Sequence, residues 1–281
     1  MTLNSTCTET INQTALQLVE RLRSYGPVAV AFSGGVDSAV VAKAAVEAWG
    51  ERAVAVTAVS PSLANSELEI AHAEALVIGI RHVELRTDEF ERPEYRRNAG
   101  DRCFFCKDTL YTLARAQLTE LQVGCIVNGA NTDDLGDHRP GMKAAIDHDV
   151  RSPLIEEGIS KATVRELAHY WNLTVADKPA APCLASRIAY GVEVTEERVQ
   201  RVERAEALLK SLTGSDDLRV RCEAADLARI EVPLAVLSRL TEPAVRAAIA
   251  GQLRQLGFRC VTLDLEGLRP GSLNELLPIV Q

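Results

Sequence analysis

Over the first half of the chain, short runs of apolar residues alternate with longer stretches in which apolar residues have helical spacing. Glycine, proline or polar residues bound each short run. Each run is too short for a helix and suits a buried strand. The predicted strands are 28–32, 53–59, 81–86 and 124–129. The predicted helices are 9–24, 39–49, 66–78 and 103–121. Strands that alternate with helices predict an α/β fold with a parallel, doubly wound sheet.

The pattern changes in the second half. A polar, loop-rich connection is expected from Asp133 to Arg151, and a helix from Ser160, its N-cap, to Trp171. Pro179 and Pro182 then exclude regular structure. Helices are expected at 196–212 and 243–256, and strands at 218–223, 227–232 and 258–265. We therefore predict two domains, 1–190 and a smaller α+β domain at 191–281.

The segment between the first strand and its helix reads Ser33-Gly34-Gly35-Val36-Asp37-Ser38. A strand, a glycine turn and a helix start direct backbone N–H groups and the positive end of a helix dipole at an anion, which predicts a phosphate site. A Walker A loop would carry a lysine, and this loop has none. The phosphate charge must then be met by Mg²⁺, with Asp37 as its ligand. An ordinary turn of small residues is the structural alternative.

Ligands of doubly wound sheets bind at the carboxyl ends of the strands. Ser33, Ser60 and the segment from Asn128 to Asp134 each follow a predicted strand. We therefore expect these residues to converge on one site.

Composition narrows the functional classes. Of 281 residues, 47% are hydrophobic and 25% charged, which is typical of a globular protein, and no apolar run approaches membrane-spanning length. The N-terminus lacks the features of a signal peptide, so we expect a cytoplasmic protein. A formal net charge of −8 and an aromatic content of 4% disfavour binding of a large nucleic acid.

Three of the seven cysteines stand out. Cys103 and Cys106 are spaced i, i+3 at the start of a predicted helix, where the dipole favours thiolates. Cys183 lies on the proline-stiffened loop. No fourth cysteine or histidine is near any of them in the sequence, and three thiolates fit a 4Fe-4S cluster with one free iron better than a four-coordinate zinc site. At this level a cluster, a zinc site and unliganded thiols all remain open.

Several arginines are candidate phosphate ligands. Arg219 and Arg221 share one face of a predicted strand, and paired guanidinium groups suit a phosphate. A solvated strand face is nearly as good an explanation of the spacing. Arg187 and Arg269 lie beside serine, glycine or proline in irregular segments and are equally ambiguous.

The loop at 33–38 resembles the PP-loop of the N-type ATP pyrophosphatases, which implies cleavage of ATP to AMP and pyrophosphate. Further segments resemble the LarE family in combination, and with the loop they extend over essentially the whole chain. They are Asp101-Arg102-Cys103-Phe104-Phe105-Cys106-Lys107, Asn128-Gly129-Ala130-Asn131-Thr132-Asp133-Asp134, Arg139-Pro140-Gly141, Pro182-Cys183-Leu184-Ala185-Ser186-Arg187, Arg219-Val220-Arg221 and Ala228-Arg229-Ile230-Glu231-Val232.

The resemblance implies a sulfur transferase of nickel-pincer nucleotide synthesis, which serves lactate racemase. The family adenylates a carboxylate of pyridinium-3,5-biscarboxylic acid mononucleotide with ATP and converts it to a thiocarboxylate. Some members sacrifice one cysteine, at the position of Cys183, and others hold a 4Fe-4S cluster with three. Because Cys103, Cys106 and Cys183 are all present, the chain is similar to the cluster type.

The resemblance also implies that Arg219 and Arg221 bind the substrate phosphate, that the chain forms homo-oligomers, and that upstream and downstream enzymes of the pincer cofactor are its partners. Cys183 and Asp37 are the expected catalytic residues. The expected metal-binding residues are Cys103, Cys106, Cys183 and Asp37. The expected nucleotide- and substrate-binding residues are Ser33, Gly34, Gly35, Val36, Asp37, Ser38, Ser60, Asn128, Arg187, Arg219, Arg221 and Arg269.

Two other enzyme classes share the PP-loop. A cluster-dependent tRNA thiolase has the same plan of cysteines, but the acidic composition and the absence of zinc-finger cysteine clusters disfavour it. An amide-forming ligase of the NAD or GMP synthetase type would leave the cysteines without a role. A simple nucleotide-binding module needs neither the cysteines nor the second arginine site.

Overall fold

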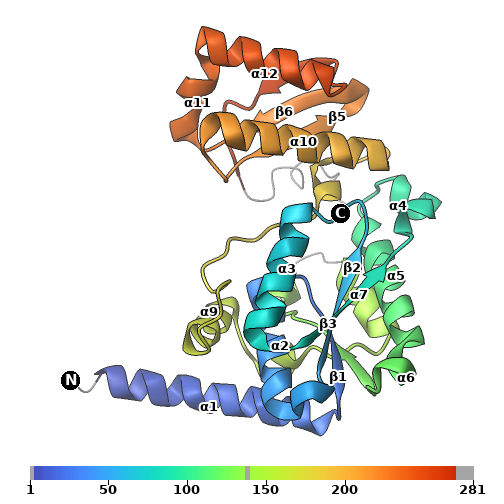
Figure 1. Ribbon diagram of the computed structural model, residues 1–281, viewed down its shortest axis with the longest axis vertical. Helices are drawn as coiled ribbons and strands as arrows, with labels where there is room; N and C mark the ends of the chain where they lie inside the picture. The colour runs from blue at the N-terminus through green and yellow to red at the C-terminus, as the bar shows by residue number, and fades with distance from the viewer. Residues whose placement is uncertain (1–2, 137–139, 270–281) are drawn as a thin grey trace. The chain divides into compact units, whose positions relative to one another are not determined.

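The computed structural model describes residues 3–136 and 140–269 (Figure 1). The chain forms two compact units, and each combines two stretches of sequence. The first unit comprises 1–89 and 103–181, and the second comprises 90–102 and 182–281. The division falls at 182 instead of 190, and it assigns a short segment of the first half to the second unit. The predicted boundary at 190 remains a prediction.

A parallel four-stranded sheet forms the centre of the first unit, with the strand order β3-β2-β1-β4. The strands are β1 (Val28–Ala31), β2 (Val54–Val59), β3 (Arg81–Arg86) and β4 (Cys125–Val127). All four predicted strands are present, and the α/β class with a parallel sheet is confirmed.

Helices pack on both faces of this sheet, because successive strand residues point to opposite sides. Val28 and Val30 of β1 belong to one apolar core with α1, α2 and α9, whereas Ala29 and Ala31 belong to a second core with α5 and α7. The helices of the first unit are α1 (Leu3–Ser24), α2 (Val36–Trp49), α3 (Asn65–Ile78), α5 (Arg102–Ala116), α6 (Leu118–Leu121), α7 (Pro140–Asp147), α8 (Pro153–Glu156) and α9 (Lys161–Tyr170), with Arg102 of α5 counted in the second unit.

The second unit contains a three-stranded mixed sheet with the order β5-β6-β7. Strand β5 (Arg219–Glu223) is antiparallel to β6 (Leu227–Glu231), and β6 is parallel to β7 (Cys260–Leu263). The helices of this unit are α4 (Pro93–Arg96), α10 (Glu196–Thr213), α11 (Leu234–Thr241) and α12 (Pro243–Gln255).

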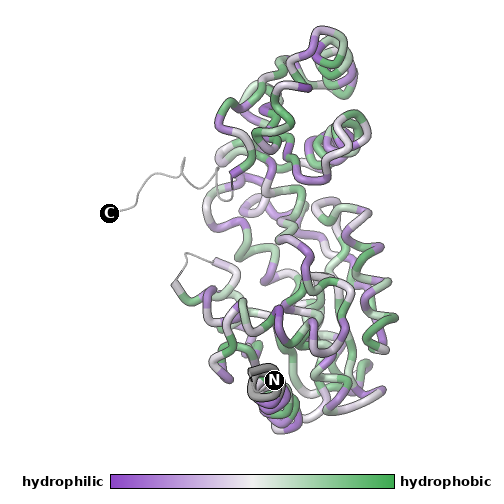
Figure 2. The backbone as a smooth tube through the Cα atoms, turned by 90° about the vertical axis from the view of Figure 1, so that its left-hand side faces the viewer, coloured by the Kyte–Doolittle hydropathy of each residue, from purple (hydrophilic) through white to green (hydrophobic). Residues whose placement is uncertain are grey.

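Two predictions of local structure were wrong. The connection from Asp133 to Arg151 contains a helix, α7, which Pro140 can begin because a helix leaves its first N–H groups unbonded. The helix expected over 103–121 is interrupted at Gln117, between α5 and α6. Hydrophilic and hydrophobic residues alternate along the helices of both units (Figure 2), and no described helix is both long and apolar enough to cross a membrane.

Candidate functional site

The PP-loop is closed around the hydroxyl of Ser38. The backbone N–H of Ser33 donates to Ser38 Oγ at 3.2 Å, and Ser38 Oγ donates to the carbonyl of Gly35 at 3.0 Å. Ser38 is buried, whereas Ser33 is exposed. The loop therefore keeps its shape through its own side chains, directly before the positive end of the α2 dipole.

Two glycines allow neighbouring segments to approach the loop. Gly34 has a φ of +68°, and a Cβ added there would lie 2.9 Å from the Cα of Ala71 in α3. At Gly129, after β4, an added Cβ would lie 2.8 Å from the backbone nitrogen of Ser38. Both contacts exclude a side chain, so the two glycines are required by close backbone approach.

Asp37 lies at the centre of a polar group, and the other members of this group are distant from it in the sequence. Its Oδ1 accepts from Asn131 Nδ2 at 3.0 Å, and its Oδ2 accepts from Lys161 Nζ at 2.5 Å. Lys161 is the first residue of α9, and its backbone N–H donates to Asp133 Oδ1 at 3.3 Å. The loop thus receives from α9 the lysine that its own sequence lacks.

A second lysine reaches the loop from the segment after α9. Lys178 Nζ lies 2.6 Å from Glu67 Oε2 and 3.5 Å from the carbonyl oxygen of Gly34. Arg165 of α9 fixes the backbone of this segment by donating to the carbonyl of Ala176 at 2.6 Å. The sequence analysis missed both lysines. The only available signal was the position of Lys161 directly after the N-cap Ser160.

Ser60 and Asn128 follow β2 and β4 as predicted, but the bonds of their side chains are to residues outside the PP-loop. Ser60 Oγ lies 2.9 Å from Ser62 Oγ. Asn128 Oδ1 accepts from the backbone N–H of Ala130 at 3.1 Å and from Ser152 Oγ at 2.9 Å. The contacts of Asp37 bring the segment from Asn128 to Asp134 to the PP-loop, and they do so through Asn131.

Magnesium binding at Asp37 agrees with the donor chemistry. Within 3–136 and 140–269 no three His, Cys, Asp or Glu side chains are grouped so as to hold a metal ion. Mg²⁺, however, is usually bound through one or two carboxylates together with substrate phosphates and water. Each oxygen of Asp37 accepts from one of these two donors and keeps a further lone pair, so the carboxylate suits an ion that arrives with ATP.

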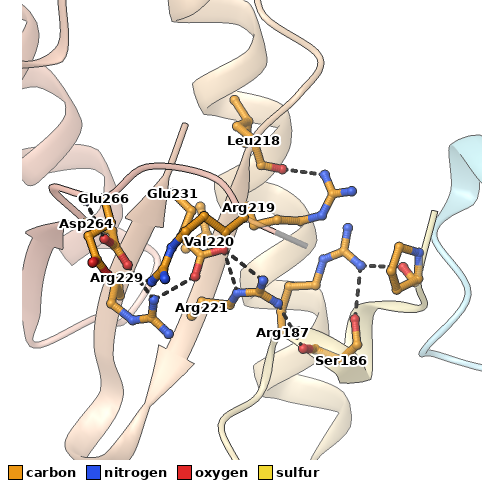
Figure 3. Close-up of polar contacts among 12 residues, drawn as sticks. Ser186, Arg187, Leu218, Arg219, Val220, Arg221, Arg229, Glu231, Asp264 and Glu266 are labelled. Atoms are coloured by element: carbon orange, nitrogen blue, oxygen red, sulfur yellow. Dashed lines mark hydrogen bonds and ion pairs between the residues drawn. The ribbon is translucent and has the colours of Figure 1, made fainter. Parts of the chain in front are cut away.

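The arginines of the second unit differ in how they are paired (Figure 3). Arg221 is buried and donates to Glu231 Oε2 from Nε at 3.0 Å and from Nη2 at 2.8 Å. Arg229 lies 2.6 Å from Glu231 Oε1 and 2.7 Å from Asp264. Glu231 is fully buried between the two guanidinium groups, so this part of the cluster is neutralised internally.

Arg219 is the exception. It donates to the carbonyl of Leu218 at 2.6 Å and pairs with no carboxylate in the described part of the chain. Burial lowers the pKa of Arg219, the nearby guanidinium groups of Arg187 and Arg221 lower it further, and Glu206 only partly offsets them. A partly buried cation among other cations is stabilised by a nearby anion.

Arg187 is hydrogen-bonded to the loop that carries Cys183. It is buried, and its Nε lies 3.0 Å from Glu206 Oε1. Its Nη1 donates to the carbonyls of Pro182 and, at 3.1 Å, of Cys183. The side chain therefore positions the Cys183 loop. Arg269 pairs with Glu266 at 2.6 Å.

The three cysteines have accessible thiols. Cys103 is exposed and Cys106 half-buried, and both lie in the first turns of α5 as predicted. Cys183 is exposed and precedes a short 3₁₀ turn, Leu184–Arg187. Cys103 and Cys106 belong to the first unit and Cys183 to the second. Arg139, which also carried the resemblance, lies outside the described residues.

Comparison with known proteins decides the family. Residues 13–101 match the asparagine synthase family model, which represents the PP-loop superfamily. The pyridinium-3,5-bisthiocarboxylic acid mononucleotide synthase of Lactiplantibacillus plantarum is 34% identical over 265 residues, which are 94% of this chain and 95% of that protein. The chain belongs to the LarE family.

LarE proteins are ATP-using PP-loop sulfur transferases, so the chain is an enzyme of this class. Uncharacterized proteins are similar as well. One from Synechocystis is 45% identical over 88% of this chain and 92% of its own, and one from Methanocaldococcus jannaschii is 24% identical over 85% and 89%. The relationship therefore extends over both units.

Proposed function

We propose that the enzyme adenylates a carboxylate of pyridinium-3,5-biscarboxylic acid mononucleotide with ATP and then converts it to a thiocarboxylate for nickel-pincer cofactor synthesis. The observation that carries this proposal is the full-length similarity to a synthase whose named product is the bisthiocarboxylic acid mononucleotide. The PP-loop and Arg219 supply the two anion sites that the reaction needs. One suits a triphosphate, and the other suits the single phosphate of a mononucleotide.

In the first step, a carboxylate oxygen of the substrate attacks the α-phosphorus of ATP and pyrophosphate leaves. The N–H groups of the PP-loop, Lys161 and Lys178 are the donors that would bind the phosphates. Asp37 would hold Mg²⁺, which stabilises the departing pyrophosphate. Lys161 would then exchange its contact with Asp37 for a phosphate oxygen, because the metal takes the carboxylate.

In the second step, a sulfur nucleophile attacks the acyl carbon and AMP leaves. Cys103, Cys106 and Cys183 would hold a 4Fe-4S cluster, since accessible thiols are suitable ligands and three of them leave one iron open to carry the sulfur. Arg187 would hold the Cys183 loop in place during this step. A closed zinc site would need a fourth ligand besides the three thiolates, and the sequence does not provide one nearby.

The first experiment measures the products. Purified enzyme, MgATP and the mononucleotide should yield AMP and pyrophosphate in a substrate-dependent reaction. ADP as the main product would place the chain in another class of ATPase.

The second experiment concerns the cysteines. Anaerobic reconstitution should give about four irons per chain, with a broad visible absorption band, and each of Cys103→Ala, Cys106→Ala and Cys183→Ala should lose it. Cys125→Ala is the matched control, because Cys125 is a half-buried thiol elsewhere in the first unit. A complete cluster in the Cys183→Ala protein would contradict the three-ligand assignment.

The tRNA thiolase remains the second candidate because its cysteine plan is the same. A net charge of −8 suits one small anion better than a polyanion, and so does a cluster of second-unit arginines in which, within the described part of the chain, Arg187, Arg221 and Arg229 are ion-paired and Arg219 is not. We also propose that the enzyme is a homo-oligomer of the cytoplasm and that its partners are the enzymes before and after it in pincer-cofactor synthesis.

A further inference from the structure

A buried glutamate of α3 holds the segment that follows α9. Glu74 is completely buried, and its Oε2 accepts from the hydroxyl of Thr174. Its other oxygen, Oε1, is also buried and has no hydrogen-bond partner among the residues described at 3–136 and 140–269. A buried carboxyl with so few donors lowers stability, because the group has lost its hydration. Stability alone therefore does not explain a glutamate at this position. We call residues 173–178 the lysine strap.

The same face of α3 meets the lysine strap a second time, two helical turns earlier. Glu67, Ala71 and Glu74 are spaced i, i+4 and i+7, so they share one face of the helix. Glu67 Oε2 lies 2.6 Å from Lys178 Nζ at the end of the strap. Ala71, between the two glutamates, lies against the backbone of Gly34. This face of α3 therefore contacts both the PP-loop and the strap.

The two contacts with α3 fix the register of the strap. The seven residues from Glu67 to Glu74 rise about 10 Å along the helix, and the four from Thr174 to Lys178 span at most about 14 Å. The two lengths match, with the strap antiparallel to α3. A slip of one residue would move Lys178 by about 3.5 Å. That shift is as large as the 3.5 Å between its Nζ and the carbonyl oxygen of Gly34 in the PP-loop.

An arginine of α9 holds the backbone of the strap. Arg165 donates from Nη1 to the carbonyl of Ala176 at 2.6 Å and from Nη2 to that of Lys178 at 3.3 Å. A planar guanidinium binds two acceptors in a fixed geometry, which the single ammonium group of a lysine cannot reproduce. The strap is thus bound through a side chain at Thr174 and through its backbone at Ala176 and Lys178.

From these contacts we infer that Glu74 and Arg165 are positioning residues for Lys178, which place its ammonium group beside the PP-loop before ATP binds. The inference rests on the proposed function, in which Lys178 binds a phosphate of ATP. The hydrogen bond from Thr174 to Glu74 has a direction that an apolar contact lacks, so it selects one register.

Positioning and stability respond differently to replacement of this pair. When both partners of a buried hydrogen bond are replaced by apolar groups of the same shape, stability can be unchanged or raised. An apolar pair at 74 and 174 would therefore keep the fold and lose the directed bond.

The test uses the full-length protein and MgATP without the mononucleotide, so that calorimetry measures binding apart from the reaction. Glu74→Met combined with Thr174→Val replaces the buried pair by apolar groups of similar shape. Arg165→Lys keeps the charge of the second positioning residue but not its two bonds in the same geometry. Arg115→Lys is the matched control, because Arg115 of the same unit likewise donates to a backbone carbonyl, that of His148.

Lys178→Met should weaken binding of MgATP by about tenfold to a hundredfold, the range of one charge-assisted hydrogen bond. The apolar pair and Arg165→Lys should each weaken it by about threefold or more, and adding either to Lys178→Met should cause little further loss, because they act through that lysine. Binding of adenosine, which has no phosphate, should be unchanged in every variant. The apolar pair should unfold at or above the native urea midpoint, which a purely structural role does not predict.

The two proposals can fail separately. Native-like binding of MgATP by Lys178→Met would refute the phosphate role of this lysine, and the positioning inference with it. If Lys178→Met weakens binding but the apolar pair and Arg165→Lys bind MgATP as Arg115→Lys does, only the positioning inference is refuted. Equal further losses in the Lys178→Met background would also refute it, because the residues would then act elsewhere.

Two further outcomes are decisive. If the binding results are as expected but the enzyme forms no AMP with the mononucleotide, the proposed reaction is refuted and the positioning role remains. If the apolar pair does not fold, Arg165→Lys decides the question, since it leaves the bond between Thr174 and Glu74 in place.

Discussion

Replacing Asp37 by asparagine tests the polar centre of the PP-loop. Both oxygens of Asp37 accept from donors, Asn131 Nδ2 at 3.0 Å and Lys161 Nζ at 2.5 Å. An asparagine has only one acceptor oxygen, so its NH₂ group must face a second donor in either orientation. The substitution keeps the size of the side chain and removes the ion pair and the proposed Mg²⁺ ligand together.

The expected loss of stability is small. The side chains of Lys161 and Asp37 are 34% and 26% exposed, so their pair is partly solvated. Such pairs contribute about 0.2–1 kcal/mol, and the facing donors can turn to water, so the total should be about 1–2 kcal/mol. Lys161→Met in the same chain removes one facing donor. The double variant should therefore recover part of the loss, with a coupling of about 0.5–1 kcal/mol.

The assay combines urea unfolding of the native protein, both single variants and the double variant with measurement of AMP and pyrophosphate. Asp37→Asn should unfold only slightly earlier than native protein and should form no AMP, and the double variant should regain stability without regaining activity. Native-like AMP formation by Asp37→Asn would refute the magnesium role. Strictly additive losses in the double variant would refute the ion pair.

Three further predictions concern the second unit and the nature of the substrate. Arg219→Met should weaken binding of the mononucleotide by about 1.5–3 kcal/mol, measured by calorimetry, and leave ATP binding and stability nearly unchanged. Arg221→Met should also destabilise the fold, because it leaves buried Glu231 with one partner fewer. Burial raises the pKa of Cys222 from 9.0 to about 11, so as the pH rises the unfolded chain loses this thiol proton before the folded chain does. The free energy of unfolding, measured by urea titration, should therefore be intact below pH 9 and fall by about 2–3 kcal/mol between pH 9 and 11. Cys222→Ala should remove this dependence on pH. Finally, bulk tRNA should not compete with the mononucleotide. The thiolase would be favoured instead if tRNA bound tightly, if its affinity fell by about three orders of magnitude over a fourfold rise in salt, and if this binding survived Arg221→Ala.

Local signals predicted the strands and most helices well. Gly26 and Pro27 precede the strand at 28–32, and Gly34 and Gly35 follow it. Ser160 caps α9 by accepting from the N–H of Thr163. Helix α7 was missed because proline and glycine at 140 and 141 are typical of a loop. Pro140 occupies the first helical position, where proline is tolerated, and Ala144 and Ala145 of the same helix are buried.

The site was predictable only where a motif is continuous in sequence. The PP-loop, the two-cysteine segment and the Cys183 loop each lie within a few residues. Lys161 lies 124 residues after its partner Asp37, and Lys178 lies 144 residues after its partner Gly34. No local sequence pattern predicts contacts over such separations. Pairing in the arginine cluster was also unpredictable, since the spacing of Arg219 and Arg221 cannot show that Glu231 neutralises only one of them.

The discontinuous make-up of the second unit has a consequence for how the chain is synthesised. Residues 90–102 leave the ribosome long before 182–281. The side-chain amide of Asn98 donates to the carbonyls of Ile188, Ala189 and Val192, so it has no acceptors until about ninety further residues have been translated. The first unit can fold during that interval, while the second must wait for its last strand. A fragment that begins at 182 would lack the side chain that closes the turn at 188–192, and adding a peptide of residues 90–102 should complement it.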